Sequence, residues 1–185
     1  QPLVTAPYTN VAGVVAVNHD ASKIALVNGV GDVELWDRAA GQRLGLLLVG
    51  RPPKGGTPTM PPEGGTPAME RVTHLAWADN PQRLFAADAT GRLAVWDVGG
   101  AGPLATRESE LSVHALAVSQ DGGFVAVLGG DKRVKLFRLQ SAGEPAVWSL
   151  EPIETPAVAA IENVRAIAFT REPSPHLLIA LQSGA

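Results

Sequence analysis

Hydrophobic and polar residues alternate in short runs along this chain, and the runs return in the same order several times. In one pass, Ser112 to Val118 alternates and ends at a Ser-Gln-Asp-Gly-Gly turn. A continuous apolar run, FVAVL, follows, as expected of a strand that is covered on both faces. Val134 to Leu139 alternates again, Gln140 to Pro145 is predicted to be a loop, and Ala146 to Leu150 is the outermost strand. Each pass therefore predicts four strands joined by turns.

Three of these passes align without a gap, over residues 16–37, 76–97 and 117–138. Their matched aromatic positions are Trp36, Trp96 and Phe137. Trp96 and Phe137 are 41 residues apart and Trp36 and Trp96 are 60 apart, and the excess of 19 matches the Gly/Pro-rich stretch from Gly50 to Ala68. A period near forty residues that ends in a Trp-Asp pair is typical of propeller blades.

We therefore predict an all-β chain, built as β-propeller blades of four-stranded antiparallel sheets, three complete and a fourth partial. The whole chain, residues 1–185, is expected to be a single propeller segment. A lone strand is predicted at Leu3 to Tyr8, before the first repeat. The expected units are blade 1 at about residues 11–49, an insertion at 50–68, blade 2 at about 71–108, blade 3 at about 111–150 and a partial blade 4 at about 164–185.

Composition supports a folded β protein and excludes several classes of function. Hydrophobic residues make up 45% of the chain and charged residues 18%, which is enough apolar surface for a core. Twenty glycines and fifteen prolines suit short strands and turns better than long helices. A net charge of −3 argues against nucleic-acid binding, and no apolar run approaches the roughly 20 residues of a membrane span. With no cysteine, thiolate metal sites and disulfides are excluded, and redox chemistry does not indicate a compartment.

Residues that carry chemistry are sparse. The four histidines, at 19, 74, 114 and 176, show no metal-ligand spacing, and no G-x-S-x-G motif surrounds a serine. The ionisable residues of the predicted inner strands are His74, His114 and Arg165. We therefore predict no catalytic residue, no metal site and no cofactor, and expect that the protein is not an enzyme.

The endings VELWD and LAVWD, with the spacing that precedes them, resemble those of the WD-repeat β-propeller family over roughly residues 11 to 185. The resemblance implies that the Trp of each repeat packs between neighbouring blades. It also implies an Asp in the turn before that strand, bonded to a His of the preceding connection. Six residues before each aromatic stand Val30, Thr90 and Asp131, and no Gly-His pair precedes any repeat. We expect blades held mainly by apolar packing.

Three tryptophans have predicted places in these blades. Trp36 and Trp96 are expected in the core. Trp148 lies in a predicted outer strand, where core packing is favoured over an exposed interface anchor.

The resemblance implies a noncatalytic protein–protein interaction scaffold, part of a larger propeller or multi-domain assembly. The expected partners are proteins or the remainder of the same propeller, with self-association through open blade edges, and neither nucleic acid nor membrane. The alternative is a ligand-binding or enzymatic propeller whose polar site lies in blades absent from this chain.

One rim of the propeller is the predicted contact surface, because propeller function lies on loops held by rigid blades. The turns between second and third strands share that rim with the Gly50 to Ala68 loop, which is either a partner-binding element or a solvated insertion. Asn28 belongs to the same rim. The candidate partner-binding residues are Arg51, Lys54, Asp88, Asp131 and Lys132.

Overall fold

The computed structural model describes residues 11–47, 69, 71–79, 83–100, 103–154, 158, 161–171 and 174–182. The predicted strand at Leu3 to Tyr8 and the insertion at 50–68 lie outside the described residues. The described part of the chain contains fourteen strands, which group into four antiparallel sheets.

Three of the sheets have four strands each, and the fourth has two described strands. We call the sheets blades 1 to 4 in chain order. Blade 1 consists of β1 (Val11–Val17), β2 (Lys23–Asn28), β3 (Val33–Asp37) and β4 (Gln42–Leu47). Blade 2 consists of β5 (Val72–Trp77), β6 (Arg83–Asp88), β7 (Arg92–Asp97) and β8 (Pro103–Glu108). Blade 3 consists of β9 (Val113–Val118), β10 (Phe124–Gly129), β11 (Val134–Ala142) and β12 (Val147–Ile153). Blade 4 consists of β13 (Val164–Phe169) and β14 (Leu177–Leu181).

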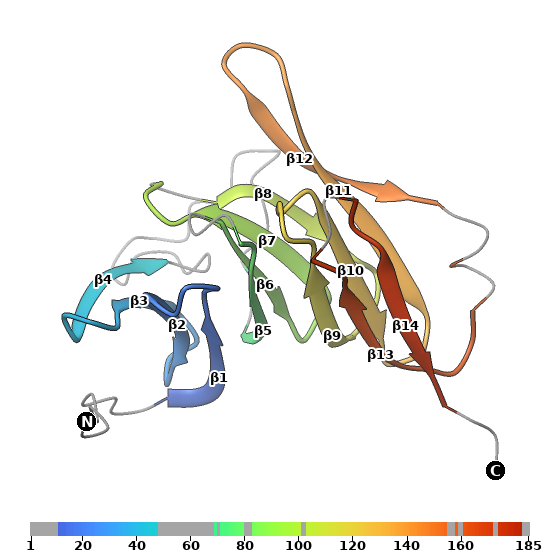
Figure 1. The fold of residues 1–185 in the computed structure, drawn as a ribbon, viewed down its shortest axis with the longest axis horizontal. Helices are drawn as coiled ribbons and strands as arrows, with labels where there is room; N and C mark the ends of the chain where they lie inside the picture. Colours follow the sequence, from blue (N-terminus) through green and yellow to red (C-terminus); the bar gives the residue numbers. More distant parts are fainter. Residues whose placement is uncertain are drawn as a thin grey trace, which may run out of the picture.

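Strand order within each sheet follows the order of the chain, so every connection inside a blade joins neighbouring strands. The predicted set of three complete blades and one partial blade is therefore confirmed. The four sheets follow one another across the molecule from blade 1 to blade 4, as the colour sequence in Figure 1 shows.

Neighbouring blades pack face to face. Residues two apart in a strand share one face of its sheet, so each interface is formed by alternate residues of the strands. Val33 and Leu35 of blade 1 belong to the same buried cluster as Trp96 of blade 2. Leu93 of blade 2 packs in the next cluster with Phe137 of blade 3. The aromatic residue at the matched position therefore faces the preceding blade in both cases, as predicted for Trp96.

Trp36 differs from Trp96, although the two occupy the same repeat position. Trp36 is only half-buried, whereas Trp96 is 2% exposed. The face of blade 1 that carries Trp36 has no blade packed against it in the described part of the chain, and its indole nitrogen donates to Glu34 at 3.1 Å. The prediction that Trp36 lies in the core is wrong for this reason.

Side chains close the turns between the second and third strands, in place of the family's Asp–His pair. In blade 1, Asn28 accepts hydrogen bonds from the backbone N–H groups of Val30 and Asp32, both at 3.1 Å. Asp88 does the same in blade 2, accepting from Thr90 and Arg92 at 2.9 Å. These are local side-chain-to-backbone turns, which Asn and Asp favour.

A cation–aromatic contact joins blades 2 and 3. The Arg83 guanidinium lies 4.6 Å from the centroid of the Trp148 ring, and its Nε lies 3.7 Å from an Asp97 oxygen. Trp148 is half-buried and packs against the cluster between the two blades. The favoured interpretation of Trp148 as a packing residue agrees with this position.

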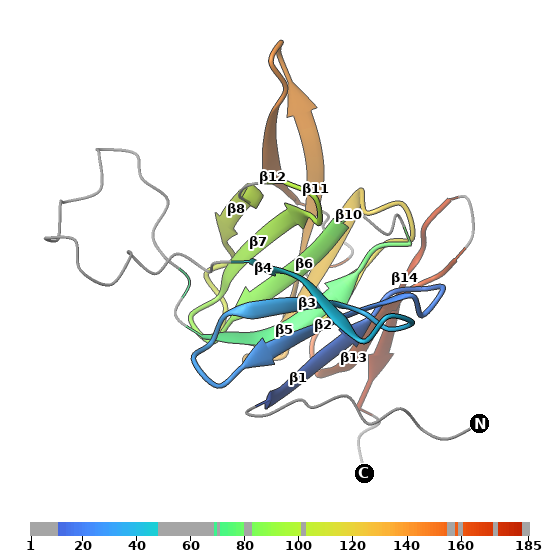
Figure 2. The ribbon, with the colours of Figure 1, turned by 90° about the vertical axis from the view of Figure 1, so that its left-hand side faces the viewer.

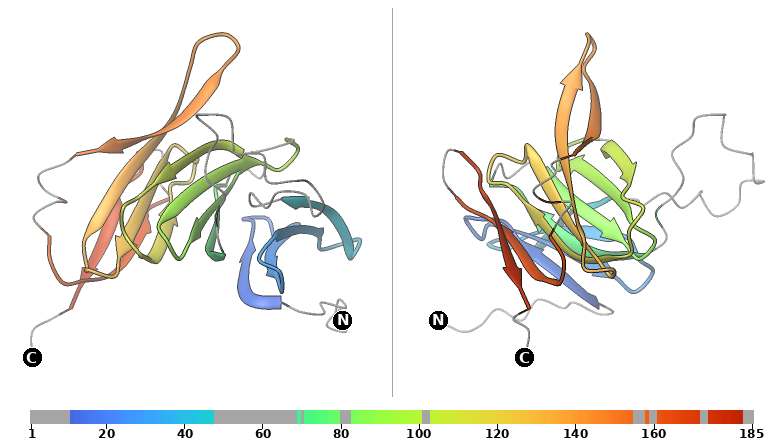
Figure 3. Two further views of the ribbon diagram at one scale, coloured as in Figure 1. Left: turned by 180° about the vertical axis from the view of Figure 1, so that it is seen from behind. Right: turned by 90° about the vertical axis from the view of Figure 1, so that its right-hand side faces the viewer.

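Half of the loop predicted from Gln140 to Pro145 is strand. β11 continues to Ala142, and Ala142 pairs with Val147 at the start of β12. The ladder of cross-strand pairs extends the hairpin past the other strands of the blade, and Figures 2 and 3 show it projecting from the molecule. Only residues 143–146 form the turn. The sequence prediction failed here because polar, exposed residues resemble a loop when their pairing partner is unknown.

The blade interface predicts different costs for two equivalent substitutions. Trp96→Ala should lower the free energy of unfolding by about 3–5 kcal/mol, because it opens a cavity between two sheets. Trp36→Ala is the matched control and should lose clearly less, since that ring is already partly in water. Urea unfolding of both variants measures the difference. A loss below about 1 kcal/mol at Trp96 would show that its ring does not hold the blades together.

Candidate functional site

The inner strands of the four blades lie along the centre of the structure. β5 contacts β1 on one side and β9 on the other, and β9 contacts β13. Two sets of equivalent residues lie at the two ends of these inner strands, one set near the start of each strand and one just beyond its end. We call the region between them the central channel.

At one end, each inner strand is bulged at the same repeat position. In β5, β9 and β13 the pairing register shifts at one extra residue, and in β1 it shifts over residues 12–14, which include the corresponding position. A bulge leaves one residue without its ladder partner and increases the local twist. The residues at this position are Gly13, Thr73, His114 and Arg165.

The predicted channel histidine His74 links two of these strands. Its Nε2 lies 3.1 Å from the carbonyl oxygen of His114, and its Nδ1 lies 3.0 Å from the Thr73 hydroxyl. Because a carbonyl oxygen only accepts, Nε2 carries the donated proton. Loss of water around the ring lowers the pKa of His74 below its ordinary value, and this outweighs the carbonyl contact, which raises it.

At the other end, one side chain stands two residues beyond each inner strand. In every blade, the residue just before this side chain donates its backbone N–H to a carbonyl oxygen at the start of the second strand, or one residue before it, at 2.9 to 3.3 Å. This shared hydrogen bond shows that the four positions are equivalent. We call the four residues the polar ring, and they are His19, Asp79, Gln120 and Arg171.

Members of the polar ring contact one another across blades. Arg171 Nη1 lies 3.0 Å from His19 Nδ1, and that nitrogen lies 3.9 Å from Asp79 Oδ1. The backbone N–H of Asp79 donates to the carbonyl oxygen of Gln120 at 2.8 Å. Asp79 Oδ2 is buried and has no hydrogen-bond partner in the described part of the chain. A buried carboxylate oxygen without a donor is costly, which marks this place as incomplete.

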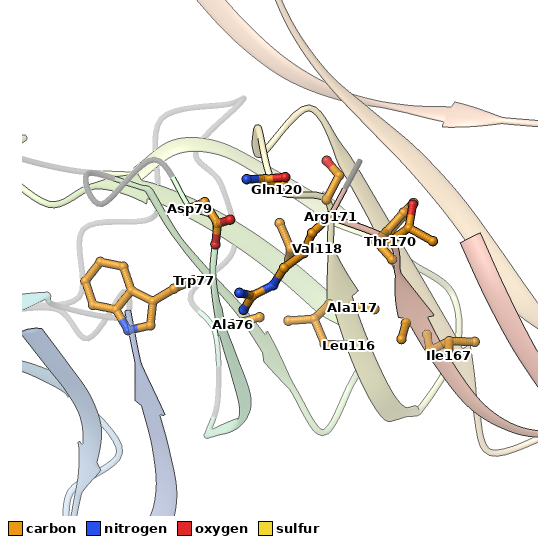
Figure 4. Close-up of a pocket in the computed structure, with 13 residues that line it drawn as sticks. Ala76, Trp77, Asp79, Leu116, Ala117, Val118, Gln120, Ile167, Thr170 and Arg171 are labelled. Carbon is orange, nitrogen blue, oxygen red and sulfur yellow. The ribbon is translucent and has the colours of Figure 1, made fainter. Parts of the chain in front are cut away.

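A cavity of about 330 Å³ lies beside the polar ring, between β5, β9 and β13. Trp77, Leu116 and Ile167 contribute apolar lining, and Asp79 and Arg171 contribute polar groups. Figure 4 shows the Arg171 side chain reaching from β13 across β9 toward Asp79. Trp77 is held by a hydrogen bond from its indole N–H to the carbonyl oxygen of Ala16 at 3.1 Å.

The polar ring was missed by sequence reasoning, although the signal was present. His19, Asp79 and Gln120 stand at one position of the three gapless repeats. The ionisable residues predicted to face the channel lie in the inner strands, whereas the polar ring lies in the turns that follow these strands. Their different side chains also hide the equivalence, which the shared backbone hydrogen bond reveals.

The predicted rim residues have different surroundings. Asp88 is fully buried and its carboxylate closes the turn, so it is not available on the surface. This overturns the prediction that Asp88 lies on an exposed contact face. Asp131 and Lys132 are exposed in the turn between β10 and β11, and their role in partner binding stays a prediction. Arg51 and Lys54 lie outside the described residues.

Among the described residues, no group of three or more His, Asp or Glu side chains is arranged to hold a metal ion. Within the same part of the chain, no helix has both the length and the hydropathy needed to cross a bilayer.

Solved structures of β-propellers are similar to this chain. The β-propeller domain of Cps50 (Swd1) from Myceliophteria thermophila has a TM-score of 0.65 and 15% identity, covering 96% of this chain and 51% of that one. Hsv2 from Kluyveromyces lactis has a TM-score of 0.57 and 12% identity, covering 76% and 45%. U3-55K has a TM-score of 0.58 and 16% identity, covering 87% and 43%. These likenesses show that the chain has a partial β-propeller fold.

The chain spans about half of the length of these structures, or less. No family model matches the sequence. No curated protein matches it either.

The burial of His74 predicts a pH-dependent part of the stability. Because its folded pKa is lowered, the unfolded chain binds more protons between that value and the ordinary 6.5. This contribution is complete above about pH 6.5 and is lost as the pH falls toward the folded pKa. His74→Gln should therefore reduce the difference between the free energies of unfolding at pH 7.5 and 5.5.

Urea unfolding at the two pH values measures this difference. His176→Gln, at an exposed histidine, is the control and should leave the difference as in the original chain. Equal effects of the two substitutions would contradict a special role for the half-buried His74 ring.

Proposed function

We propose that this chain is a noncatalytic protein–protein interaction scaffold of the WD-repeat type, and that it forms part of a larger propeller or multi-domain assembly. The observation that carries the proposal is an apolar face at each end of the row of blades, against which no blade packs in the described part of the chain. The likeness to β-propellers in which this chain covers only about half the length supports it.

The outward face of blade 1 is largely apolar, and Glu34, which accepts a hydrogen bond from Trp36, is a charged member of it. Val17 pairs with Ile24, and Ile24 pairs with Trp36, so these three side chains share that face. Val17 is 50% exposed, and Val15 on the same face is 53% exposed. Apolar faces of this kind on a rigid sheet mark contact surfaces.

The outward face of blade 4 is made of small and apolar residues. Ala168 pairs with Leu178 and Ala166 with Ala180, and all four are exposed. Leu178 alone is 55% exposed. Ile167 and Ile179, on the other face, pack against blade 3.

A further propeller blade is the occupant that best fits these faces. Trp96 and Phe137 each pack on the preceding blade, so the face with Trp36 suits a surface like that of Val33 and Leu35. The blade comes either from the remainder of the same propeller or from another protein chain.

The exposed rim and the projecting hairpin supply surface for other partners. Asp131 and Lys132, with Arg51 and Lys54, carry the mixed charge that is usual at the rim of an interface. The end of the hairpin, residues 140–147, is exposed on both strands. Ligand binding, the alternative function, is favoured by one observation, the channel cavity beside Asp79 and Arg171.

The apolar end faces predict that the isolated chain self-associates. Sedimentation velocity should show species larger than a monomer, increasing with concentration. Val17→Glu places a charge on the outward face of blade 1 and should shift the distribution toward monomer. Val147→Glu, at an equally apolar and exposed site on the hairpin, is the matched control. A stable, cooperative monomer at high concentration would contradict the proposal.

The loop on the predicted contact rim gives a second test. Deleting residues 50–68 restores the 41-residue spacing, so the fold should survive, as circular dichroism can verify. In a pull-down from the native source, we expect the folded deletion variant to lose a partner that the full chain retains. If it keeps every partner, the segment is a passive insertion and the contact lies elsewhere.

A further inference from the structure

We propose that the polar ring contains a pH-sensitive switch, in which the His19 ring binds Arg171 of blade 4 when it is neutral and Asp79 of blade 2 when it is protonated. Blades 2 and 3 lie between blades 1 and 4 in the row, as Figure 1 shows, yet the His19–Arg171 contact joins blade 1 directly to blade 4. The switch is a regulatory feature that the scaffold function does not require.

One nitrogen of His19 faces both partners. Nδ1 lies 3.0 Å from Arg171 Nη1 and 3.9 Å from Asp79 Oδ1. A guanidinium only donates and stays protonated in proteins, so Nδ1 is the acceptor of the shorter contact. The separation of 3.9 Å from the carboxylate oxygen is too long for a hydrogen bond. In this arrangement His19 is therefore neutral and carries its proton on Nε2.

A proton on Nδ1 reverses these roles. The nitrogen becomes a donor, and it can no longer accept from the guanidinium 3.0 Å away. The two cations also repel each other, whereas the Asp79 carboxylate attracts the imidazolium. Shortening the 3.9 Å separation to hydrogen-bond length needs a movement of about 1 Å. The contact between blades 1 and 4 is thus exchanged for one between blades 1 and 2.

Solvent has access to the ring that changes charge. The His19 side chain is 53% exposed, whereas that of Asp79 is 21% exposed. Imidazole is the side chain that ordinarily changes charge between about pH 5 and 8. A proton can therefore reach Nδ1 from water without opening the blades.

The other charged groups near this turn keep their own partners. Hydrogen bonds from Ser22, with a smaller effect of the Lys23 charge, lower the pKa of Asp20, which stays ionised between pH 5 and 8. Arg38 donates to a backbone carbonyl oxygen of the same turn at 3.3 Å. Blade 3 contributes Gln120 to the polar ring, and this side chain has no charge. Among the described members of the ring, His19 is thus the group whose charge changes in this range.

Nuclear magnetic resonance on the full chain tests the exchange of partners. Nitrogen-15 signals of the His19 ring follow its protonation between pH 8 and 5.5, and carbon-detected signals of the Arg171 guanidinium report how well that side chain is ordered. We expect Arg171 to be ordered at pH 8 and to become mobile as the pH falls. The midpoint of this change should equal the midpoint of the His19 titration.

A substitution at His19 separates protonation of this ring from other effects of pH. His19→Gln keeps an oxygen that can accept from Arg171 but that is not protonated in this range. The Arg171 signals of this variant should no longer depend on pH. His114→Gln is the matched control, because His114 is an exposed histidine near the start of β9, at the opposite end of the inner strands. It should leave the Arg171 transition as in the original chain.

Two further variants test the partners of the ring. Asp79→Asn removes the carboxylate that favours the charged ring, and should move the His19 midpoint to lower pH. Arg171→Gln removes the opposing cation and should move the midpoint to higher pH. Each shift is expected to be roughly 0.2–0.7 of a pH unit, the size that a partly exposed pair of charges produces. Asp131→Asn and Arg133→Gln, in the turn between β10 and β11, are the matched controls and should leave the midpoint unchanged.

Three results would overturn the proposal. They are an Arg171 side chain that is equally ordered at pH 8 and 5.5, an Arg171 transition that persists in His19→Gln, and an Asp79→Asn variant whose His19 midpoint does not fall. Should a substitution prevent folding, the comparison of the His19 and Arg171 midpoints in the unsubstituted chain still decides whether protonation releases the guanidinium.

Discussion

Face-to-face packing of four-stranded sheets is the constraint on which the rest of this structure depends. Successive side chains of a strand point to opposite faces of its sheet. Because the middle strands carry apolar residues on both faces, each blade must bury both. Trp96 and Phe137 fill the space toward the preceding blade, while Leu35 and Leu93 face the following one. At each described interface between blades 1, 2 and 3, the face that carries the matched aromatic residue packs on the aliphatic face of the preceding blade. A blade of this kind without neighbours on both sides leaves apolar area in water.

The same packing aligns the inner strands and thereby builds the channel. Because the blades repeat one geometry, a given repeat position recurs at one height along the channel in each of them. Bulges occupy the position of Thr73 and His114 at one end, and polar side chains occupy the position of Asp79 and Arg171 at the other. The repeat thus gathers residues that lie far apart in the chain. Arg171 and His19, which are 152 positions apart, contact each other for this reason.

Local hydrogen bonds stabilise the turns within each blade, and apolar packing stabilises much of the contact between blades. The turns are closed by Asn28 and Asp88 acting on their own backbone, so a polar contact between blades is not required there. Between blades, Arg83 lies over the Trp148 ring, hydrogen bonds join His74 to His114 and Trp77 to Ala16, and the clusters of buried residues are apolar. A frame of this kind tolerates different side chains in its loops and at its channel ends. Scaffold and ligand-binding roles are therefore compatible on one chain.

The sequence alone determined the number and order of the blades. The alternation, the turns and the spacing from Trp96 to Phe137 are local or periodic features, and they carry to the structure without knowledge of contacts. Only the tertiary structure decided which of the matched residues are buried. Trp36 and Trp96 have the same local sequence pattern, but Trp96 faces another sheet, whereas Trp36 faces none in the described part of the chain. Asp88 was predicted to lie on the surface, because its residue type does not specify that its carboxylate is buried and accepts hydrogen bonds from the backbone N–H groups of the turn. The strand beyond Gln140 and the polar ring depend on pairing partners and on neighbouring blades. These are contacts between distant segments, and no local pattern specifies them.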